Sequence, residues 1–318
     1  MPKRRKLALA YDPLCKKHRP GPTHPERPER VDACLGGVVE VATAEDTVEL
    51  DPAVVTDAEL TLCHTQEYVD LARQEVEDGR WCLSTGDTSI CPGSWDAAVA
   101  AVGLVLEAAD TVFAGSADLA FCPVRPPGHH ATPTRGMGFC VLNNVAIAAR
   151  YVQREYHLER VAIIDWDVHH GNGTQEAFYE DPSVFYFSTH QSPLYPGTGR
   201  REETGSGPGK GTTMNCPVPQ GAGREEILGA LREKLVPAMV EFKPQIVLLS
   251  AGFDGHRDDP IGGLRLTDDD FADITRLCLE IADTHAEGRL ISVLEGGYNL
   301  TALMSAVAAH TSVLIGKS

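Results

Sequence analysis

The chain has 318 residues and a mass of 34.3 kDa, which is long enough to bury a substantial core. Apolar residues make up 42% and charged residues 23%, so a disordered, collagen-like or coiled-coil chain is excluded, and the longest apolar run, over 97–106, is too short to span a membrane. The net charge of −17 repels nucleic acid and attracts cationic substrates.

The N-terminus departs from this acidic character. Residues 1–30 hold nine Lys and Arg against three Asp and Glu. A nuclear address or a polyanion contact is one interpretation of the basic run at 3–6, but we expect residues 1–6 to form a flexible, solvated terminus. Residues 7–10 are too short for a signal-peptide core, and nine cysteines without a CxxC pair indicate free thiols. Both observations favour a cytoplasmic protein.

Short apolar runs alternate with longer amphipathic stretches, a pattern typical of a parallel sheet with helices on both faces. Ser94 and Thr267 stand where helix caps are expected. Without repeats or long linkers, the whole chain, 1–318, is expected to form a single domain. In chain order, the pattern predicts a strand at 7–11, a helix at 94–113, a strand at 118–124, a helix at 143–156, strands at 161–167 and 184–188, a helix at 224–242, a strand at 245–250, a helix at 268–286, a strand at 290–294 and a helix at 301–315.

Four of the predicted strands run directly into polar, glycine-rich loops. In open α/β sheets, ligands bind in the crevice outside the carboxyl ends of the strands. We therefore expect these loops to meet at one edge of the sheet and to form the functional site. They read RPPGHH at 125–130, VHHGNG at 168–173, AGFDGH at 251–256 and EGGYN at 295–299.

Asp165, Asp167 and His169 are spaced by two residues at the end of a predicted strand. On extended backbone, this spacing points the three side chains to one face of the sheet. Such a set indicates a bound cation, because burying two like charges without one is costly; carboxylates held only by backbone N–H groups are the alternative. Asp254 is the candidate third ligand, although an isolated Asp in a glycine-rich loop is more often a turn residue.

His129, His130 and Tyr298 supply acid–base and hydrogen-bonding groups. The Pro-Pro-Gly turn presents the two histidines rigidly, and a neutral imidazole accepts a proton readily near pH 7. The glycine-flanked phenol can donate a hydrogen bond to a carbonyl oxygen as negative charge develops. A surface loop for the histidines and a core-edge position for the tyrosine stay open. Together with a metal, these groups predict metal-assisted hydrolysis at a carbonyl.

Five motifs resemble the zinc-dependent histone deacetylase and acetylpolyamine amidohydrolase family, most closely its class II and bacterial members. The resemblance extends from about residue 11 to residue 316 and implies the arginase/deacetylase fold, a single α/β domain around an eight-stranded parallel sheet. The motifs are RPPGHHA at 125–131, GFCVLNN at 138–144, DWDVHHGNGTQ at 165–175, SAGFD at 250–254 and EGGYN at 295–299.

The resemblance implies a metal site and a catalytic set. The implied Zn²⁺ ligands are Asp167, His169 and Asp254, although the same ligands also suit Fe²⁺, Co²⁺ or Mn²⁺. The implied general base and acid, electrostatic support and carbonyl-polarising phenol are His130, His129 and Tyr298. Asp165 matches the carboxylate behind His129, and Asn172, the class II residue, matches the position behind His130. A structural K⁺ site is implied at Asp165, Asp167, His169, Ser188 and Thr189.

A narrow tunnel for an acyl-lysine side chain is also implied. Phe139 and Tyr195 match its aromatic walls, with a Tyr where class II usually has Phe, and Asp87 loosely matches a residue that holds the substrate backbone. Polyamine-selective relatives carry a Glu where this chain has Ile261, which favours acyl-lysine over acetylpolyamine. The expected partner is an acyl-lysine protein or peptide, or a small acylated amine. Two glycines, Gly138 and Gly296, complete the implied lining.

Three other functions are weighed against a lysine deacetylase. The first is an acetylpolyamine deacetylase, and the second is a non-catalytic module that binds acylated ligands or partner proteins. The third, an arginase-type hydrolase with two manganese ions, needs an Asp where this chain has His256. The sequence leaves the oligomeric state open, and a homo-oligomer is compatible with it.

Overall fold

The computed structural model describes residues 4–317, and its centre is one eight-stranded sheet. All neighbouring strands are parallel, in the order β2-β1-β3-β8-β7-β4-β5-β6. This is the sheet that the resemblance implies. The strands are β1 (Leu7–Ala10), β2 (Thr47–Leu50), β3 (Leu119–Cys122), β4 (Val161–Asp165), β5 (Val184–Gln191), β6 (Thr213–Val218), β7 (Ile246–Ala251) and β8 (Leu290–Leu294).

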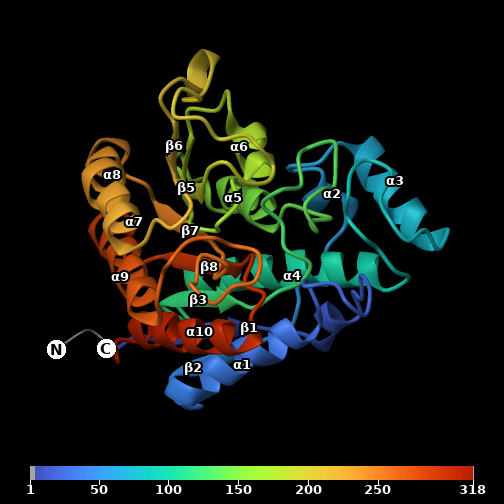
Figure 1. Cartoon of the computed structure of the whole chain (residues 1–318), viewed down its shortest axis with the longest axis horizontal. Coiled ribbons are helices and arrows are strands. Elements are labelled where there is room, and N and C mark those ends of the chain that lie inside the picture. Colours follow the sequence, from blue (N-terminus) through green and yellow to red (C-terminus); the bar gives the residue numbers. More distant parts are fainter. Residues whose placement is uncertain (1–3, 318) are drawn as a thin grey trace.

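Helices cover both faces of the sheet (Figure 1). One group lies toward the left and bottom of the view: α1 (Glu29–Val41), α7 (Arg224–Ala230), α8 (Val236–Phe242), α9 (Asp268–His285) and α10 (Leu300–Leu314). The other lies toward the top and right: α2 (Asp57–Leu60), α3 (Gln66–Glu77), α4 (Ser94–Phe113), α5 (Asn144–Tyr156) and α6 (Asn172–Phe178).

The central strands contribute to two hydrophobic cores, because alternate side chains of a strand point to opposite faces. In β4, Val161 and Ile163 belong to the core shared with α4 and α5, whereas Ala162 and Ile164 belong to the core shared with α9 and α10. All four are fully buried. Burial on both faces explains why these strands read as unbroken apolar runs.

All the predicted strands and helices occur, with ends shifted by a few residues. The predicted helix at 224–242 is interrupted by a π-helical turn over Leu231–Leu235, because Pro237 at the start of α8 has no N–H to continue the ladder. Thr267 caps α9 through a capping box. Ser94 does not cap α4, since its hydroxyl contacts His18 and accepts from the Cys91 N–H instead.

Among the strands and α-helices of residues 4–317, six were not expected from the sequence: β2, β6, α1, α2, α3 and α6. Both strands are edge strands, and Pro217 in β6 argues against a strand in a sequence-based reading. Helix α1 contains Gly36 and Gly37, which normally weaken a helix. A Cβ at Gly37 would lie 2.3 Å from the Met304 carbonyl oxygen, so glycine is needed there for close packing against α10.

The basic residues Arg4, Arg5 and Lys6 are fixed to the body of the protein. The Arg4 guanidinium donates to Asp46 at 2.9 Å and the Lys6 ammonium to the Glu45 carbonyl at 2.8 Å. Arg5 is buried and pairs with Asp283 at 2.6 Å. For these residues the structure differs from the predicted flexible terminus, because each cation finds an acceptor; residues 1–3 lie outside the described part.

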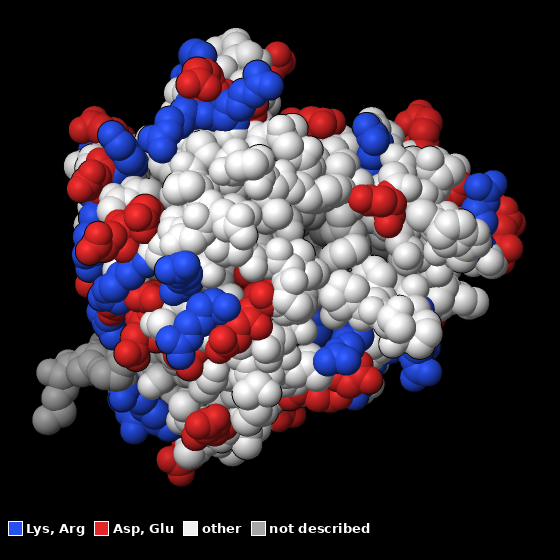
Figure 2. All heavy atoms as spheres, viewed as in Figure 1, with Lys and Arg blue, Asp and Glu red and all other residues white. Residues whose placement is uncertain are grey.

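Charged side chains lie mainly toward the edges of the face seen in Figure 2, and the middle of that face is largely uncharged. All nine cysteines are free thiols, as their spacing predicts. Among the described helices, none is long and apolar enough to cross a membrane.

Candidate metal centre

Asp167, His169 and Asp254 come together in a buried cluster at the carboxyl edge of the sheet. The first two follow β4 and the third follows β7, and these strands are paired, with Asp165 opposite Ser250. The three side chains each offer a ligand atom within 4.8 Å of the others. The two loops therefore form the convergent set that the sequence predicts.

Backbone N–H groups orient both carboxylates and leave one oxygen of Asp254 without a hydrogen-bond partner. Asp167 Oδ2 accepts from the Gly296 N–H at 2.7 Å, and Asp254 Oδ1 accepts from the Val168 N–H at 2.9 Å. Asp254 Oδ2 is buried without a hydrogen-bond partner, and it lies 3.2 Å from His169 Nδ1. An orphaned carboxylate oxygen beside an imidazole nitrogen fits a divalent cation.

The electrostatics of this cluster also favour a cation. Burial, together with the charge of Asp167, raises the pKa of Asp254 to about 7. Burial by itself would lower the pKa of His169, but Asp167 and Asp254 outweigh that effect and raise it to about 10. The pocket thus gathers positive charge, as a proton or as a metal ion. His256 lies outside the cluster, with its Nε2 3.5 Å from Asp268.

His129 and His130 follow β3 and lie beside the metal cluster. His129 Nδ1 is 3.0 Å from Asp165 Oδ2, and His130 Nδ1 is 2.8 Å from Asn172 Oδ1. Both partners are acceptors, so each histidine carries a proton on Nδ1 and turns its Nε2 away from that partner. His129 Nε2 lies 3.8 Å from Asp167 Oδ1. Asp165 and Asn172 therefore lie behind His129 and His130, where the sequence predicts them.

Tyr298 lies on the loop after β8, held by a buried arginine. The guanidinium of Arg30 is centred 4.9 Å from the Tyr298 ring and donates from Nε to the Gly297 carbonyl at 2.6 Å. Burial and the nearby Asp254 raise the pKa of the phenol well above its usual value. Tyr298 therefore keeps its proton and can donate a hydrogen bond.

The two predicted aromatic walls of the tunnel lie beside the catalytic candidates. The Tyr195 ring lies edge-on to His130 at 5.1 Å, and the Phe139 ring lies edge-on to Tyr298 at 6.0 Å. Asp87 Oδ1 accepts from the Gly138 N–H at 2.7 Å and lies 3.3 Å from the Tyr195 hydroxyl. Asp87 thus joins the two aromatic walls.

Two glycines fit tightly around the site. Gly138 has a φ of +59°, and a Cβ there would lie 2.3 Å from His130 Cδ2. A Cβ at Gly296 would lie 1.9 Å from Asp254 Oδ2. Gly296 therefore packs directly on the metal cluster, deeper than a position on the outer tunnel wall.

Three residues of the site were missed by sequence reasoning. His24 packs edge-on against Phe139 at 4.5 Å, next to the aromatic wall. Glu295 is fully buried, and its Oε2 accepts from the N–H groups of Gly128 at 2.7 Å and His129 at 3.1 Å. Arg30 is the third. Glu295 stands inside the EGGYN motif, which is the signal that could have found it.

The predicted K⁺ residues lie on the neighbouring strands β4 and β5 and in the loop that follows β4. Asp165 pairs with Ser188 in the sheet register, and the Ser188 hydroxyl contacts His190 Nδ1 at 2.8 Å. The buried Thr189 hydroxyl has no hydrogen-bond partner. The structure thus places Asp165 beside Ser188, while the ion itself stays a prediction.

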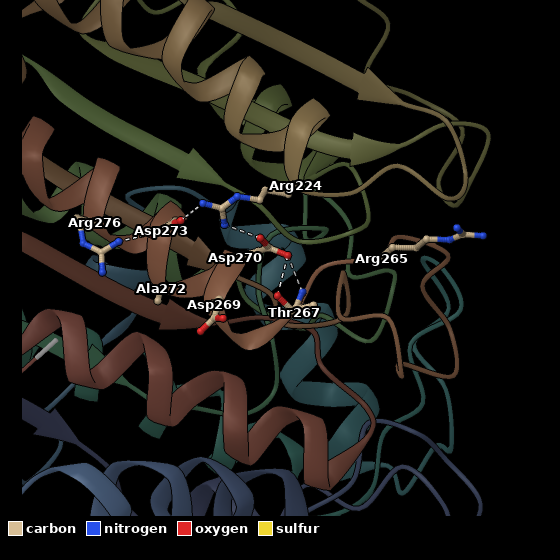
Figure 3. A pocket seen from close by; sticks show the side chains of 8 residues that line it. All are labelled: Arg224, Arg265, Thr267, Asp269, Asp270, Ala272, Asp273 and Arg276. Atoms are coloured by element: carbon tan, nitrogen blue, oxygen red, sulfur yellow. Dashed lines mark hydrogen bonds and ion pairs between the residues drawn. The ribbon is translucent and has the colours of Figure 1, made fainter.

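A separate hollow of about 640 Å³ lies between the starts of α7 and α9. Figure 3 shows that most of its charged groups are paired: Arg224 donates to Asp270 at 2.7 Å and also pairs with Asp273, whereas Arg265 and Asp269 stand apart from these pairs. The predicted site residues do not line it. This hollow is therefore separate from the Asp167–His169–Asp254 cluster.

Comparison with known proteins agrees with this geometry. The family described as "Histone deacetylase domain" matches residues 24–314. The chain belongs to this family. A "Probable deacetylase" of Archaeoglobus fulgidus is 44% identical over 89% of this chain and 79% of its own length. A "Histone deacetylase-like amidohydrolase" of Pseudomonas aeruginosa is 34% identical over 93% and 82%.

A solved structure extends this similarity to the whole fold. The "Crystal Structure of HDA15 HD domain" matches with a TM-score of 0.92 and 34% identity, covering 98% of this chain and 89% of that one. The histone deacetylase fold and a hydrolase of the deacetylase family are therefore established for this chain.

Proposed function

We propose that this histone deacetylase family member is a zinc-dependent amidohydrolase that removes an acetyl or other acyl group from the ε-amine of lysine. The observation that carries the proposal is the buried Asp167–His169–Asp254 cluster with His130 and Tyr298 on its border. A metal site, a neutral base and a protonated phenol together supply the groups for metal-assisted hydrolysis of an unactivated amide. The whole chain serves as one catalytic domain in this account.

Asp167, His169 and Asp254 would hold the metal. When bound, it supplies a Lewis acid that polarises the acyl carbonyl and makes water a better nucleophile. Three protein ligands leave a coordination position open, as in catalytic zinc sites. The ligand set also suits Fe²⁺, Co²⁺ and Mn²⁺, and zinc is our choice from the family resemblance.

His130 is the proposed general base and acid. Because Nδ1–H is donated to Asn172, Nε2 is free to take a proton from the attacking water. The same Nε2 then returns that proton to the amine that leaves. Burial, then repulsion from His129 and His169, lowers the pKa of His130 well below its usual value, so the imidazole is neutral when it is needed.

His129 and Tyr298 are proposed to stabilise the charge that develops. The carboxylates of Asp165 and Asp167 outweigh burial and hold the pKa of His129 well above its usual value. A positive His129 offsets oxyanion charge, and the phenol of Tyr298 donates to the carbonyl oxygen. A complete set of such groups supports an enzyme over a module that only binds acylated ligands.

The rim supports acyl-lysine over acetylpolyamine as the substrate. Phe139 and Tyr195 would flank an aliphatic side chain, with Asp87 available to accept from a substrate backbone N–H. Ile261 offers no charge to a distant ammonium group. A structural K⁺ at Asp165, Asp167, His169, Ser188 and Thr189 and a cytoplasmic location, in keeping with nine free thiols, belong to the same proposal.

The proposal is tested with the zinc-loaded protein on acyl-lysine peptides of different chain length, free acyl-lysine and acetylated polyamines. We expect the highest kcat/KM on an acyl-lysine substrate. A higher kcat/KM on N8-acetylspermidine than on every lysine substrate would assign the chain to polyamines instead.

A further inference from the structure

The peptide group between Gly297 and Tyr298 is held from both sides by buried side chains of opposite charge. Its carbonyl accepts from Arg30 Nε at 2.6 Å, and its N–H donates to Asp259 Oδ2 at 2.8 Å. Arg30 is 0% and Asp259 8% exposed. Hydrogen bonds to ionised groups are about twice as strong as neutral ones, so this pair fixes the plane of the peptide.

The need for such anchors follows from the loop itself. Gly297 has a φ of +120°, a region that side chains rarely enter, and glycine is the residue with the most backbone freedom. Tyr298 begins directly after it, so its Cα–Cβ direction depends on how the 297–298 peptide is oriented. External contacts must supply the rigidity that the local sequence lacks.

The same Asp259 carboxylate also shapes the tunnel rim. Its Oδ1 accepts from the N–H groups of Ile261 at 2.9 Å and Gly262 at 3.2 Å. Within residues 4–317, the three hydrogen bonds recorded for this carboxylate all come from backbone N–H groups. One buried side chain therefore joins the turn that carries Ile261 to the peptide that carries Tyr298.

A second contact runs parallel to this one. Asn299 Nδ2 donates to the Asp258 carbonyl at 2.9 Å, and Asn299 Oδ1 accepts from the first turn of α10. The loop after β7 and the loop after β8 are thus linked on both sides of Tyr298. A shift of the rim turn is expected to move the phenol, because these hydrogen bonds tie the loop after β7 to the backbone at Tyr298 and to the side chain of Asn299.

We propose that Asp259 is a positioning residue that fixes Tyr298 in its donating orientation and couples it to the Ile261 rim turn. This assignment rests on the proposed role of Tyr298 in polarising the acyl carbonyl. Asp259 does not reach the reacting atoms in this account. It acts on the transition state through the phenol, so its removal lowers kcat and leaves substrate affinity largely intact.

The test uses Asp259→Asn in the zinc-loaded protein, with Asp258→Asn as its matched control. Asn has nearly the volume of Asp, but an NH₂ donor replaces one of the two carboxylate oxygens. This donor would face backbone N–H groups that need an acceptor. Asp258 is the neighbouring carboxylate, with a side chain 60% exposed. We expect D259N to lower kcat about 10- to 100-fold with KM changed less than about threefold, and D258N to change both less than about twofold.

A double mutant separates positioning from general damage. In a Tyr298→Phe background, where the phenol hydroxyl is absent, D259N should lower the residual rate by less than about twofold. Equal losses from D259N with and without the Tyr298 hydroxyl would overturn the proposal, as would equal effects of D259N and D258N. Zinc content is measured for each variant, and loss of zinc from D259N alone would also overturn it.

A readout without turnover keeps the inference separate from the proposed function. In protein labelled with 3-fluorotyrosine, the ¹⁹F resonance of residue 298 is identified by its loss in Y298F. D259N should shift or broaden it, D258N should not, and an unchanged resonance in D259N would overturn the inference. If the wild type hydrolyses none of the substrates, the proposed function fails. The ¹⁹F resonance of residue 298 then decides by itself whether Asp259 positions Tyr298. Should D259N not fold, Asp259→Ser, whose hydroxyl can serve the rim turn but is too short for Tyr298, replaces it throughout.

Discussion

The imidazoles of His129 and His130 lie 4.1 Å apart, yet their environments shift the two pKa values in opposite directions. Burial by itself would lower the pKa of both histidines. For His129, the charges of Asp165, Asp167 and Glu295 outweigh burial and raise the pKa well above its usual value, whereas burial and repulsion lower the pKa of His130. Adjacent residues of one type thus acquire a cationic and a neutral role from their partners.

The neutral amide of Asn172 is predicted to set the acidic limb of the pH–rate profile. Asn172→Asp places a carboxylate where the Asn172 oxygen lies 2.8 Å from His130 Nδ1. The carboxylate favours the imidazolium, so the pKa of His130 rises. Since the base must be neutral, the acidic limb of kcat/KM should move to higher pH. An unchanged limb would exclude His130 as the base.

Asp254 is predicted to be essential for metal binding. Zinc in hundredfold excess over its Kd should raise the Tm of the wild type by roughly 4 °C. Asp254→Asn should abolish this increase, because it removes the orphaned carboxylate oxygen. Metal analysis and thermal unfolding with and without zinc check both statements. Asp258→Asn, which alters an exposed carboxylate nearby, should keep the full increase.

Glu295 is predicted to hold the histidine loop by accepting from two backbone N–H groups. Glu295→Ala leaves both groups without an acceptor and should cost roughly 2–5 kcal/mol of stability in urea unfolding. Glu295→Gln keeps an acceptor and should cost much less. Equal losses for the two variants would show that packing, and not hydrogen bonding, is the contribution of this side chain.

The difference in stability between Glu295→Gln and the wild type is predicted to depend on pH. Burial raises the pKa of Glu295 to about 7, above the value near 4.3 for an unfolded chain. The contribution of such a carboxyl group to folding stability falls as pH rises from its pKa in the unfolded chain to its pKa in the folded protein. The stability of E295Q relative to the wild type should therefore increase between pH 5 and pH 8. A constant difference across this range would contradict the raised pKa.

Ile261 is predicted to contribute to the choice between lysine and polyamine substrates. Ile261→Glu adds a carboxylate at the rim, which attracts the distant ammonium of an acetylpolyamine. The ratio of kcat/KM for N8-acetylspermidine to that for an acetyl-lysine peptide should rise about tenfold or more. Ile261→Leu is the neutral control. A ratio that stays the same would place the selectivity elsewhere.

The sequence predicts the centre of the fold better than its edges. Strands β4, β7 and β8 are buried on both faces, so apolar runs and the polar loops after them are easy to recognise. Strand β6 contains Asn215 and Pro217 at a sheet edge, and α1 contains paired glycines that only the contact with α10 explains. Local propensity argues against both elements, and tertiary packing decides.

The same division applies to the site. The spacing of Asp165, Asp167 and His169 predicts a cation site from the sequence alone, although only Asp165 lies in β4 and the other two lie in the bend that follows it. Arg30 and Asp259 act through backbone groups of a loop distant in sequence. No spacing within the chain encodes such contacts, so only the folded arrangement reveals them.

The central claim is metal-dependent amide hydrolysis assisted by Tyr298. The most direct measurement compares zinc-loaded and zinc-stripped wild type with zinc-loaded Tyr298→Phe on the best acyl-lysine substrate. We predict turnover only with the metal and a loss of about 10²–10³ in kcat for the variant, as for loss of one oxyanion donor, with zinc retained. Turnover that survives both changes would contradict the mechanism, and a metal-loaded wild type that binds acyl-lysine without hydrolysing it would identify a binding module.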